Sequence, residues 1–275
     1  MWTLSGFADE ISADLDEQCR VLNELGISYI EFRSAWGTNV LDLDDDQLKL
    51  AAETLSRYGI ATSSIGSPIG KIGIADDFDA HLARFDRALQ VAELLHAPFI
   101  RIFSFFIPAN DTPDAYRDEV LRRMSALASR AEGHDVTLVH ENEKEIYGDI
   151  PARCLDIVES VGSERLRLAW DAANYVQCGV RPYTEGYESL RPYTDYIQIK
   201  DALLADGTVV PAGEGDGEVE TTIVALREDG FDGFFSMEPH LSAGGRFGGF
   251  SGPERFIKAT HAFTSILDGR GIEYR

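Results

Sequence analysis

The chain has 275 residues, of which 44% are apolar and 26% are charged. These proportions are typical of folded globular proteins and exclude a disordered or low-complexity chain. The 47 acidic residues outnumber the 25 basic ones, and a net charge of −22 opposes binding to the phosphate backbone of nucleic acid.

No stretch approaches the ~18 consecutive apolar residues of a membrane span. The opening MWTLSGFADEIS has no basic region and no apolar run of signal length. The three cysteines are scattered and form no CxxC motif, which indicates a reducing compartment and no structural zinc site. We therefore expect a cytoplasmic protein that binds neither nucleic acid nor a membrane.

Short apolar runs that are typical of strands alternate with amphipathic runs that are typical of helices along the whole chain. The expected strands are Thr3–Ala8, Ser28–Arg33, Ala61–Gly66, Phe99–Phe105, Thr137–Asn142, Leu166–Asp171, Thr194–Asp201 and Gly233–Pro239. The expected helices are Asp14–Leu25, Asp45–Tyr58, Asp77–Leu95, Thr112–Glu132, Ile150–Val161, Val219–Asp229 and Gly252–Leu267, with a weaker candidate at Pro182–Leu190.

Eight strands that alternate with eight helical segments are the pattern of a (β/α)₈ TIM barrel, an α/β fold. A doubly wound open sheet is the alternative, but the first strand is followed by FADEIS rather than by a glycine-rich phosphate turn. No linker-like segment divides the chain, so we expect a single barrel domain over residues 1–275. Several segments that follow strands are long and rich in glycine, as lids over a small-molecule pocket often are.

Polar residues with oxygen ligands stand at the ends of the last four expected strands: Glu141, Asp171, Gln198 and Glu238. A buried carboxylate costs several kcal/mol unless it is paired or bound to a metal ion. Any one of the four could be satisfied by loop amides or by a nearby Lys or Arg, but four at corresponding positions are hard to explain in this way. One divalent cation held by all four would offset their desolvation together, and a site made only of oxygen ligands favours Mn²⁺ or Mg²⁺ over zinc.

Glu141, Asp171, Glu238 and the IKD segment resemble the sugar phosphate isomerase/epimerase group of xylose isomerase-like TIM barrels. GFADEIS, YIEFR, NVLDL and SSIGSPIGK are also similar to members of that group, and the resemblance covers essentially the whole chain. It implies one Mn²⁺, Mg²⁺ or Co²⁺ ion, with Zn²⁺ as a further alternative, at the ends of strands five to eight. It also implies a possible homodimer or homotetramer.

The resemblance implies that Glu141 and Glu238 are both metal ligands and proton-transfer groups. The metal would chelate a carbonyl and an adjacent hydroxyl, one glutamate would remove the proton α to the carbonyl, and the metal would stabilise the enediolate. The substrate would be a small polyhydroxylated carbonyl compound that is isomerised or epimerised. A dehydratase or lyase acting on a keto-inositol or a 3-keto-glycoside is the alternative, because elimination begins with the same proton abstraction. Binding of a metal or sugar without turnover is a more remote third reading.

The sequence departs from the group's pattern at two positions. The group usually has His where this chain has Gln198, and sugar epimerases often have a substrate-contacting His where this chain has Asn174. These changes weigh against epimerisation of a free ketose at carbon 3, but they leave metal-assisted enediolate chemistry in place. We expect Asn174 to contact the substrate. With no clear Arg/Lys cluster in the sequence, we expect a substrate without a phosphate group.

Other polar residues have two interpretations each. Lys200 lies two residues after Gln198 and so points to the same side of its strand; it would hold a substrate oxygen or form an ion pair inside the barrel. His240 would contact substrate or lie in solvent. We expect Glu31 and Arg101, both in the middle of strands, to form a buried pair, with substrate binding as the alternative. We expect His140 to point away from the barrel interior as a structural residue.

Overall fold

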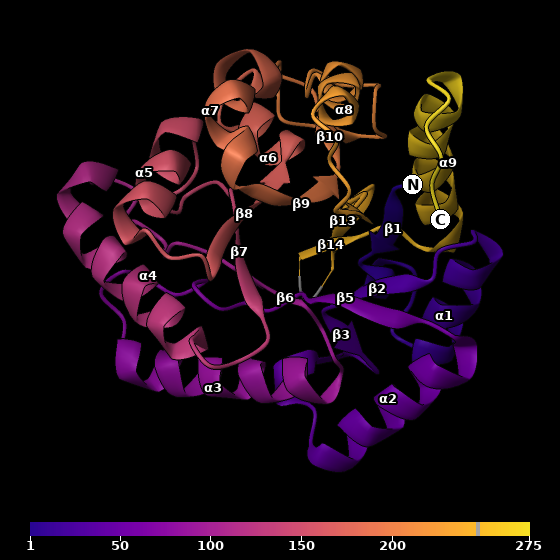
Figure 1. Cartoon of the computed structure of the whole chain (residues 1–275), viewed down its shortest axis with the longest axis horizontal. Coiled ribbons are helices and arrows are strands. Elements are labelled where there is room, and N and C mark those ends of the chain that lie inside the picture. The colour runs from indigo at the N-terminus through magenta and orange to yellow at the C-terminus, as the bar shows by residue number, and fades with distance from the viewer. Residues whose placement is uncertain (246–247) are drawn as a thin grey trace.

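The computed structural model describes residues 1–245 and 248–275. Eight parallel strands in this part of the chain form a nearly closed barrel, and the long helices surround it (Figure 1). The barrel strands are β1 (Thr3–Gly6), β2 (Tyr29–Phe32), β5 (Ala61–Ile65), β6 (Phe99–Ile102), β7 (Thr137–Glu141), β8 (Leu166–Asp171), β9 (Thr194–Ile199) and β12 (Phe234–Met237). Their order around the barrel is β1–β12–β9–β8–β7–β6–β5–β2, and β1 lies beside β2 where the barrel closes.

The α-helices of the described residues lie outside the barrel, between successive strands. They are α1 (Leu15–Glu24), α2 (Asp45–Tyr58), α3 (Phe78–Leu94), α4 (Arg117–Ala131), α5 (Pro151–Val161), α6 (Ala172–Gln177), α7 (Glu188–Leu190), α8 (Val219–Glu228) and α9 (Pro253–Gly269). Local chemistry sets their limits: Asp44 and Gln47 form a capping box at the start of α2, and Gly59 ends it in a left-handed conformation. None of these helices is long and apolar enough to cross a membrane.

The barrel predicted from the alternation of strands and helices is confirmed, and the doubly wound alternative is wrong. All eight expected strands are present, most of them one to three residues shorter than predicted. The weak helix candidate is a π-helical turn, Tyr183–Tyr187, continued by α7. Three short hairpins and α6 were not predicted; the hairpins are β3 (Ser34–Ala35) with β4 (Thr38–Asn39), β10 (Asp201–Ala202) with β11 (Val209–Val210), and β13 (Ser242–Gly245) with β14 (Gly248–Phe250).

The interior of the barrel changes from apolar to charged along its axis. Near the starts of the strands, the rings of Phe99, Tyr196 and Phe234 pack with centroids 5.6 to 6.2 Å apart. Above them, the Tyr196 hydroxyl lies 2.9 Å from Ser63 Oγ, which lies 2.6 Å from Ser5 Oγ. These groups fill the lower and middle barrel, so the inward-pointing charged residues gather at the carboxyl ends of the strands.

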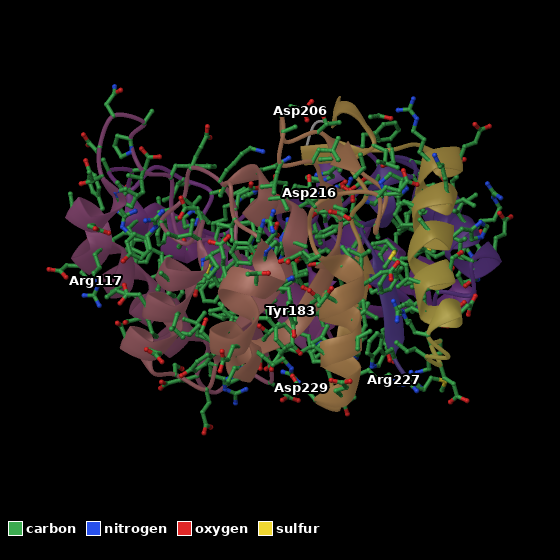
Figure 2. The ribbon with its side chains drawn as sticks, turned by 90° about the horizontal axis from the view of Figure 1, so that it is seen from above. Arg117, Tyr183, Asp206, Asp216, Arg227 and Asp229 are labelled. Carbon is green, nitrogen blue, oxygen red and sulfur yellow. The ribbon has the colours of Figure 1, made fainter. Side chains whose placement is uncertain are left out.

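A single carboxylate organises the long segment between β9 and α8. Asp201 accepts hydrogen bonds of 2.8 to 3.0 Å from the backbone N–H groups of Ala202, Gly213, Gly215 and Gly217. A Cβ atom at Gly215 would lie 2.4 Å from Asp201 Oδ1, so the close approach requires glycine there. Figure 2 shows Asp206 and Asp216 of this segment at one end of the barrel, and Arg227 and Asp229 at the other.

We expect Asp201→Ala to lower the free energy of unfolding by about 3 kcal/mol, because it leaves several backbone donors without their charged acceptor. Urea unfolding followed by circular dichroism measures the change. Asp206→Ala is the matched control: Asp206 is exposed and its hydrogen bonds come from Thr208 alone among the described contacts, so its loss should cost no more than about 1 kcal/mol. Equal effects of the two substitutions would contradict the anchoring role of Asp201.

Candidate active site

Three carboxylates meet inside the barrel at the carboxyl ends of the strands. Glu141 ends β7, Asp171 ends β8, and Glu238 directly follows β12. One oxygen of each lies within 4.8 Å of an oxygen of the others, and all three residues are at most 2% exposed. Catalytic residues of TIM barrels come from this end of the barrel. The structure therefore brings Glu141, Asp171 and Glu238 together, while their roles as metal ligands and proton-transfer groups stay predictions.

Three buried cations contact these carboxylates. Lys200 Nζ lies 2.8 Å from Asp171 Oδ2 and 3.0 Å from Glu238 Oε2. Arg101 Nη1 lies 3.0 Å from Glu141 Oε2 and 3.4 Å from Glu238 Oε1, and Arg33 Nη1 lies 3.1 Å from Glu238 Oε1. Lys200 therefore forms the ion pair inside the barrel that was one of its two predicted roles.

Two asparagines hold Glu141 and Asp171 in place. Asn174 Nδ2 donates to Glu141 Oε1 at 3.0 Å, and the Asn174 backbone N–H donates to Asp171 Oδ1 at 2.9 Å. Asn142 bonds the backbone of Asp171 through both ends of its amide, each at 2.9 Å. Asn174 lines the pocket, as a substrate-binding residue must, but its amide N–H groups already serve Glu141 and the Asn142 carbonyl.

The three carboxyl groups differ in how their surroundings shift their pKa values. Burial raises the pKa of Glu141, an effect that Arg101 partly offsets. Burial also raises the pKa of Asp171 to about 7, against the lowering effect of Lys200. Burial would raise the pKa of Glu238 as well, but Lys200, His240 and Arg101 together hold it well below its usual range. A raised pKa favours the protonated form of Glu141, and a lowered pKa favours the ionised form of Glu238. Groups that differ in this way can serve as an acid and a base.

Gln198 lies on the inner side of β9, between β8 and β12. Its register partners are Asp171 and Ser236, and it is 1% exposed. Neither its amide oxygen nor its amide nitrogen has a hydrogen-bond partner among the described residues. A buried amide without a partner costs about 1–3 kcal/mol, so this position fits a group that accepts a further ligand. Its role as a metal ligand stays a prediction.

The spacing of the three clustered carboxylates fits a bound cation, because one oxygen of each lies within 4.8 Å of an oxygen of the others. Oxygen ligands of an octahedral Mg²⁺ or Mn²⁺ lie about 3.0 to 4.2 Å apart, given metal–oxygen distances of roughly 2.1 Å. The spacing of Glu141, Asp171 and Glu238 is close to this range. Lys200 now bridges two of them, so it would have to move aside.

Glu141, Glu238, Lys200, Arg33 and Arg101 line a pocket of about 290 Å³. Val209, Lys71, Glu143, Lys144, His240 and Ser242 line its upper part. His240 reaches the pocket, as predicted, but its ring is also engaged with protein: Nε2 lies 3.3 Å from both Glu10 Oε1 and Glu238 Oε1. The pocket is lined mainly by charged and polar side chains.

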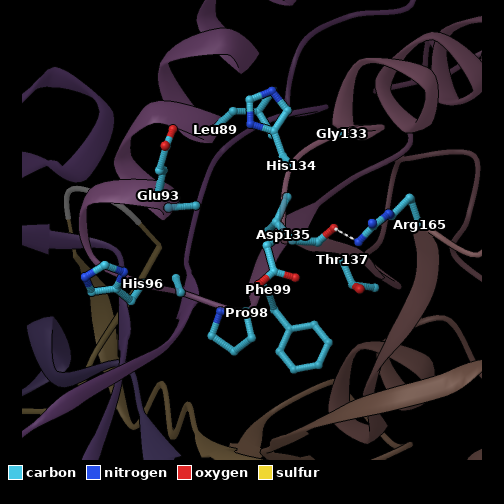
Figure 3. A pocket seen from close by; sticks show the side chains of 13 residues that line it. Leu89, Glu93, His96, Pro98, Phe99, Gly133, His134, Asp135, Thr137 and Arg165 are labelled. Carbon is cyan, nitrogen blue, oxygen red and sulfur yellow. Dashed lines mark hydrogen bonds between the residues drawn. The ribbon is translucent and has the colours of Figure 1, made fainter.

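A larger cavity of about 670 Å³ lies at the opposite end of the barrel (Figure 3). It is lined by the end of α3, the segment between α4 and β7, and the starts of β6 and β7, with His96, His134, Asp135 and Arg165 around it. The charged groups here are largely exposed, and Arg165 Nη1 donates to the Val136 carbonyl. Residues at this end of a TIM barrel contribute to stability, and the catalytic residues lie at the other end. We therefore place the active site in the smaller pocket.

The structure contradicts one other prediction about interior residues, the Glu31–Arg101 pair, and agrees with the prediction for His140. Arg101 does not form an ion pair with Glu31 among the described residues; it extends towards Glu141 and Glu238 because their carboxylates lie nearer its guanidinium. His140 is buried beside Gly148, as expected of a structural residue, and burial lowers its pKa to about 3.

Sequence reasoning missed Arg33, Glu10 and Lys71 as site residues. Arg33 follows Glu31 by two positions, so strand alternation could have placed it inside the barrel. Glu10 and Lys71 lie on segments that follow strands, and nothing in their spacing shows that they reach the site.

The chain matches the family model described as xylose isomerase-like TIM barrel over residues 19–259, and it belongs to this family. A curated relative, 2-epi-5-epi-valiolone 7-phosphate 2-epimerase from Actinoplanes sp. (strain SE50/110), is 38% identical over 100 residues. This match covers 36% of the chain and 35% of the relative, so it spans about a third of the curated protein.

Solved structures share the fold along nearly the whole chain. A D-tagatose 3-epimerase-like protein has a TM-score of 0.77 and 16% identity, with 97% of each chain covered. A xylose isomerase-like TIM barrel protein from Mycobacterium smegmatis, in complex with magnesium, has a TM-score of 0.70 and 20% identity, again over 97% of each chain. At these identities the likeness concerns the fold.

Proposed function

We propose that this chain is a divalent-cation-dependent isomerase or epimerase of a small polyhydroxylated carbonyl compound. The observation that carries the proposal is the meeting of Glu141, Asp171 and Glu238 in one buried cluster at the catalytic end of the barrel, where Glu141 and Glu238 line the pocket. Binding alone would need no pair of buried glutamates that face the same pocket. The partial similarity to a curated epimerase supports the same reaction class.

Glu141 and Glu238 serve as the acid–base pair in this proposal. One carboxylate accepts the proton from the carbon beside the substrate carbonyl; the electrons of that C–H bond form the C=C bond of an enediolate, and the carbonyl π electrons move to oxygen. Return of a proton to the other face of the same carbon, as the oxygen electrons re-form the carbonyl, gives the epimer. Return of a proton to the former carbonyl carbon gives the isomer, when the adjacent hydroxyl passes its proton to the enediolate oxygen and becomes the new carbonyl. Asn174 keeps Glu141 oriented throughout.

Glu141, Asp171, Gln198 and Glu238 would hold the divalent cation. When bound, it would supply positive charge near the oxygen that becomes negative during proton removal. All four ligands offer oxygen, which favours Mn²⁺ or Mg²⁺. The unpartnered amide of Gln198 supports its place in this set.

We expect Gln198→His to bind Zn²⁺, Co²⁺ or Ni²⁺ more tightly than the wild type, with little change for Mg²⁺, because borderline ions gain from an imidazole ligand. The new His would lack partners that orient its ring, so the gain is expected to be modest. Competition titrations by calorimetry on both proteins measure it. A variant that binds Zn²⁺ no better than the wild type would show that Gln198 is not a ligand.

Deuterium exchange tests the proposed reaction. The protein is incubated with Mn²⁺ in D₂O and offered 2-epi-5-epi-valiolone 7-phosphate and D-tagatose, the compounds that appear in the names of its relatives. We expect deuterium at the carbon beside the carbonyl of an accepted compound, together with its epimer or isomer. Exchange accompanied by loss of water would instead indicate a lyase, and unchanged compounds with a protein that binds them would indicate a binding protein.

The upper part of the pocket supports a phosphorylated substrate, which revises the expectation from the sequence. The chain has five lysines, at positions 49, 71, 144, 200 and 258, and three of them line this pocket. Lys71 Nζ lies 4.2 Å from the centre of the Phe103 ring and 3.3 Å from Glu143, while Lys144 Nζ lies 3.0 Å from Gln177 Oε1. Two lysines against one glutamate leave this rim positive, in a molecule whose net charge is −22. We propose that it binds a phosphate group.

We expect Lys71→Met and Lys144→Met each to raise the KM for a phosphorylated ketone by at least ~10-fold, because each removes a hydrogen bond to a charged group. The KM for the same ketone without phosphate should stay unchanged. Lys258→Met, which removes an exposed lysine outside the pocket, is the control. Equal effects on the two ketones would contradict a phosphate site at this rim.

A further inference from the structure

Glu10 is a buried carboxyl residue near the active site to which the mechanism above assigns no task. It ends the short 3₁₀ helix Ala8–Glu10 that follows β1, and it is 0% exposed. Its Oε2 accepts hydrogen bonds from the backbone N–H of His240 at 2.9 Å and from Ser251 Oγ at 2.8 Å. Its backbone carbonyl also accepts from Ser251 and Gly252, so Glu10 fixes both ends of the segment that follows β12.

His240 is held by Glu10 at its backbone and at its ring. Besides the bond from its N–H, its Nε2 lies 3.3 Å from Glu10 Oε1 and 3.3 Å from Glu238 Oε1. The residue has φ of 47°, a left-handed conformation that costs energy for any residue with a Cβ atom. Such a conformation persists where its surroundings enforce it, and the two contacts with Glu10 do so here.

The imidazole lies on one side of the Glu238 carboxylate. Glu238 Oε1 is surrounded by His240 Nε2, Arg33 Nη1 and Arg101 Nη1, at 3.3, 3.1 and 3.4 Å. Glu238 Oε2 faces Lys200 Nζ, which also contacts Asp171. The donors on Oε1 therefore fix the rotation of the carboxylate and turn Oε2 towards Asp171, where the carboxylate cluster lies.

We propose that Glu10 is a positioning residue that acts through His240 to orient the Glu238 carboxylate. The inference rests on the proposed role of Glu238 as ligand and acid–base group, but the contacts that carry it do not depend on that role. It requires the Nε2–H tautomer of His240, because the Nε2–H group donates a hydrogen bond to the Glu238 carboxylate.

The adjacent residue Asp9 offers a matched control. Asp9 Oδ2 accepts from Arg33 Nε at 2.8 Å, and Arg33 in turn contacts Glu238. Asp9 is thus connected to the Glu238 carboxylate through Arg33, and Glu10 is connected to it through His240. At each of the two positions, the amide substitution keeps the size and shape of the side chain that it replaces.

The first arm is a double-mutant cycle read out as Mn²⁺ affinity by calorimetry. We expect Glu10→Gln and His240→Asn each to weaken Mn²⁺ binding about 5-fold or more, and the double variant to be no weaker than the weaker single one. Asp9→Asn combined with His240→Asn should instead show additive losses, because its route runs through Arg33. Additive losses for Glu10→Gln with His240→Asn, or unchanged affinity in Glu10→Gln, would overturn the proposal.

The second experiment measures the tautomer of His240 in the metal-free wild-type protein, so it does not depend on whether a Glu10 variant folds. The imidazole ¹⁵N resonances of His240, assigned by their loss in His240→Asn, should report the Nε2–H tautomer in the wild type. A ring protonated at Nδ1 alone would overturn the positioning route. Absence of Mn²⁺ binding by the wild type, with the Nε2–H tautomer observed, would contradict the proposed cation dependence while leaving the Glu10–His240 contact supported.

Discussion

Replacing either Glu141 or Glu238 with Gln is expected to reduce turnover at least ~100-fold, the usual lower range for loss of a general acid or base. Both side chains line the pocket at the carboxyl end of the barrel, and both contact the same cation, Arg101. An amide keeps the shape of the side chain, so the fold should survive. The rate of deuterium incorporation into the accepted ketone measures the effect.

Glu145→Gln is the control for these two variants. Glu145 is exposed and lies four residues after Glu141, outside the pocket lining. Its substitution should leave turnover unchanged, while circular dichroism confirms that all three variants fold. Near-native turnover in both Glu141→Gln and Glu238→Gln would show that the acid–base pair has been assigned wrongly.

Replacing Lys200 with Met is expected to lower the free energy of unfolding by about 3–5 kcal/mol in metal-free buffer, the usual cost of removing one partner of a buried ion pair. Lys200 is 3% exposed and contacts both Asp171 and Glu238, which would be left facing each other without a cation. A divalent ion should then take the vacated position. At a free Mn²⁺ concentration of ~100 Kd, binding should restore about 2.7 kcal/mol.

Urea unfolding of wild type and Lys200→Met, with and without Mn²⁺, measures both effects. Lys258→Met, at an exposed lysine, should change stability by no more than about 0.5 kcal/mol in either buffer. If Mn²⁺ fails to restore stability to Lys200→Met, the Lys200 ammonium is itself the resident cation of the site. The proposed divalent ion would then have no place between these carboxylates.

Much of the fold could be predicted because each barrel strand is a short apolar run bounded by amphipathic segments. Helix α6 escaped prediction because its six residues directly follow Asp171 and are too few to show a helical period. The short hairpin strands escaped for a similar reason, since two to four residues cannot establish alternation.

The carboxylates of the site could be predicted because the carboxyl ends of successive parallel strands meet at one end of a barrel. Partners across the barrel could not, because they depend on how far long side chains reach. Arg101 shares a mid-strand position with Glu31 in the sequence pattern, yet its guanidinium extends to Glu141 and Glu238. The positions of Lys71 and Lys144 at the pocket could not be predicted for the same reason. Lys71 contacts Glu143, which is 72 positions away in the sequence, and only the fold brings the two together.

Anomalous diffraction from crystals of the wild-type protein grown with Mn²⁺ tests the central claim most directly. The account predicts one strong Mn²⁺ peak about 2.0–2.3 Å from carboxylate oxygens of Glu141, Asp171 and Glu238, with the Lys200 ammonium moved away from Asp171. A map without a peak at these carboxylates, in which Lys200 still bridges Asp171 and Glu238, would contradict it.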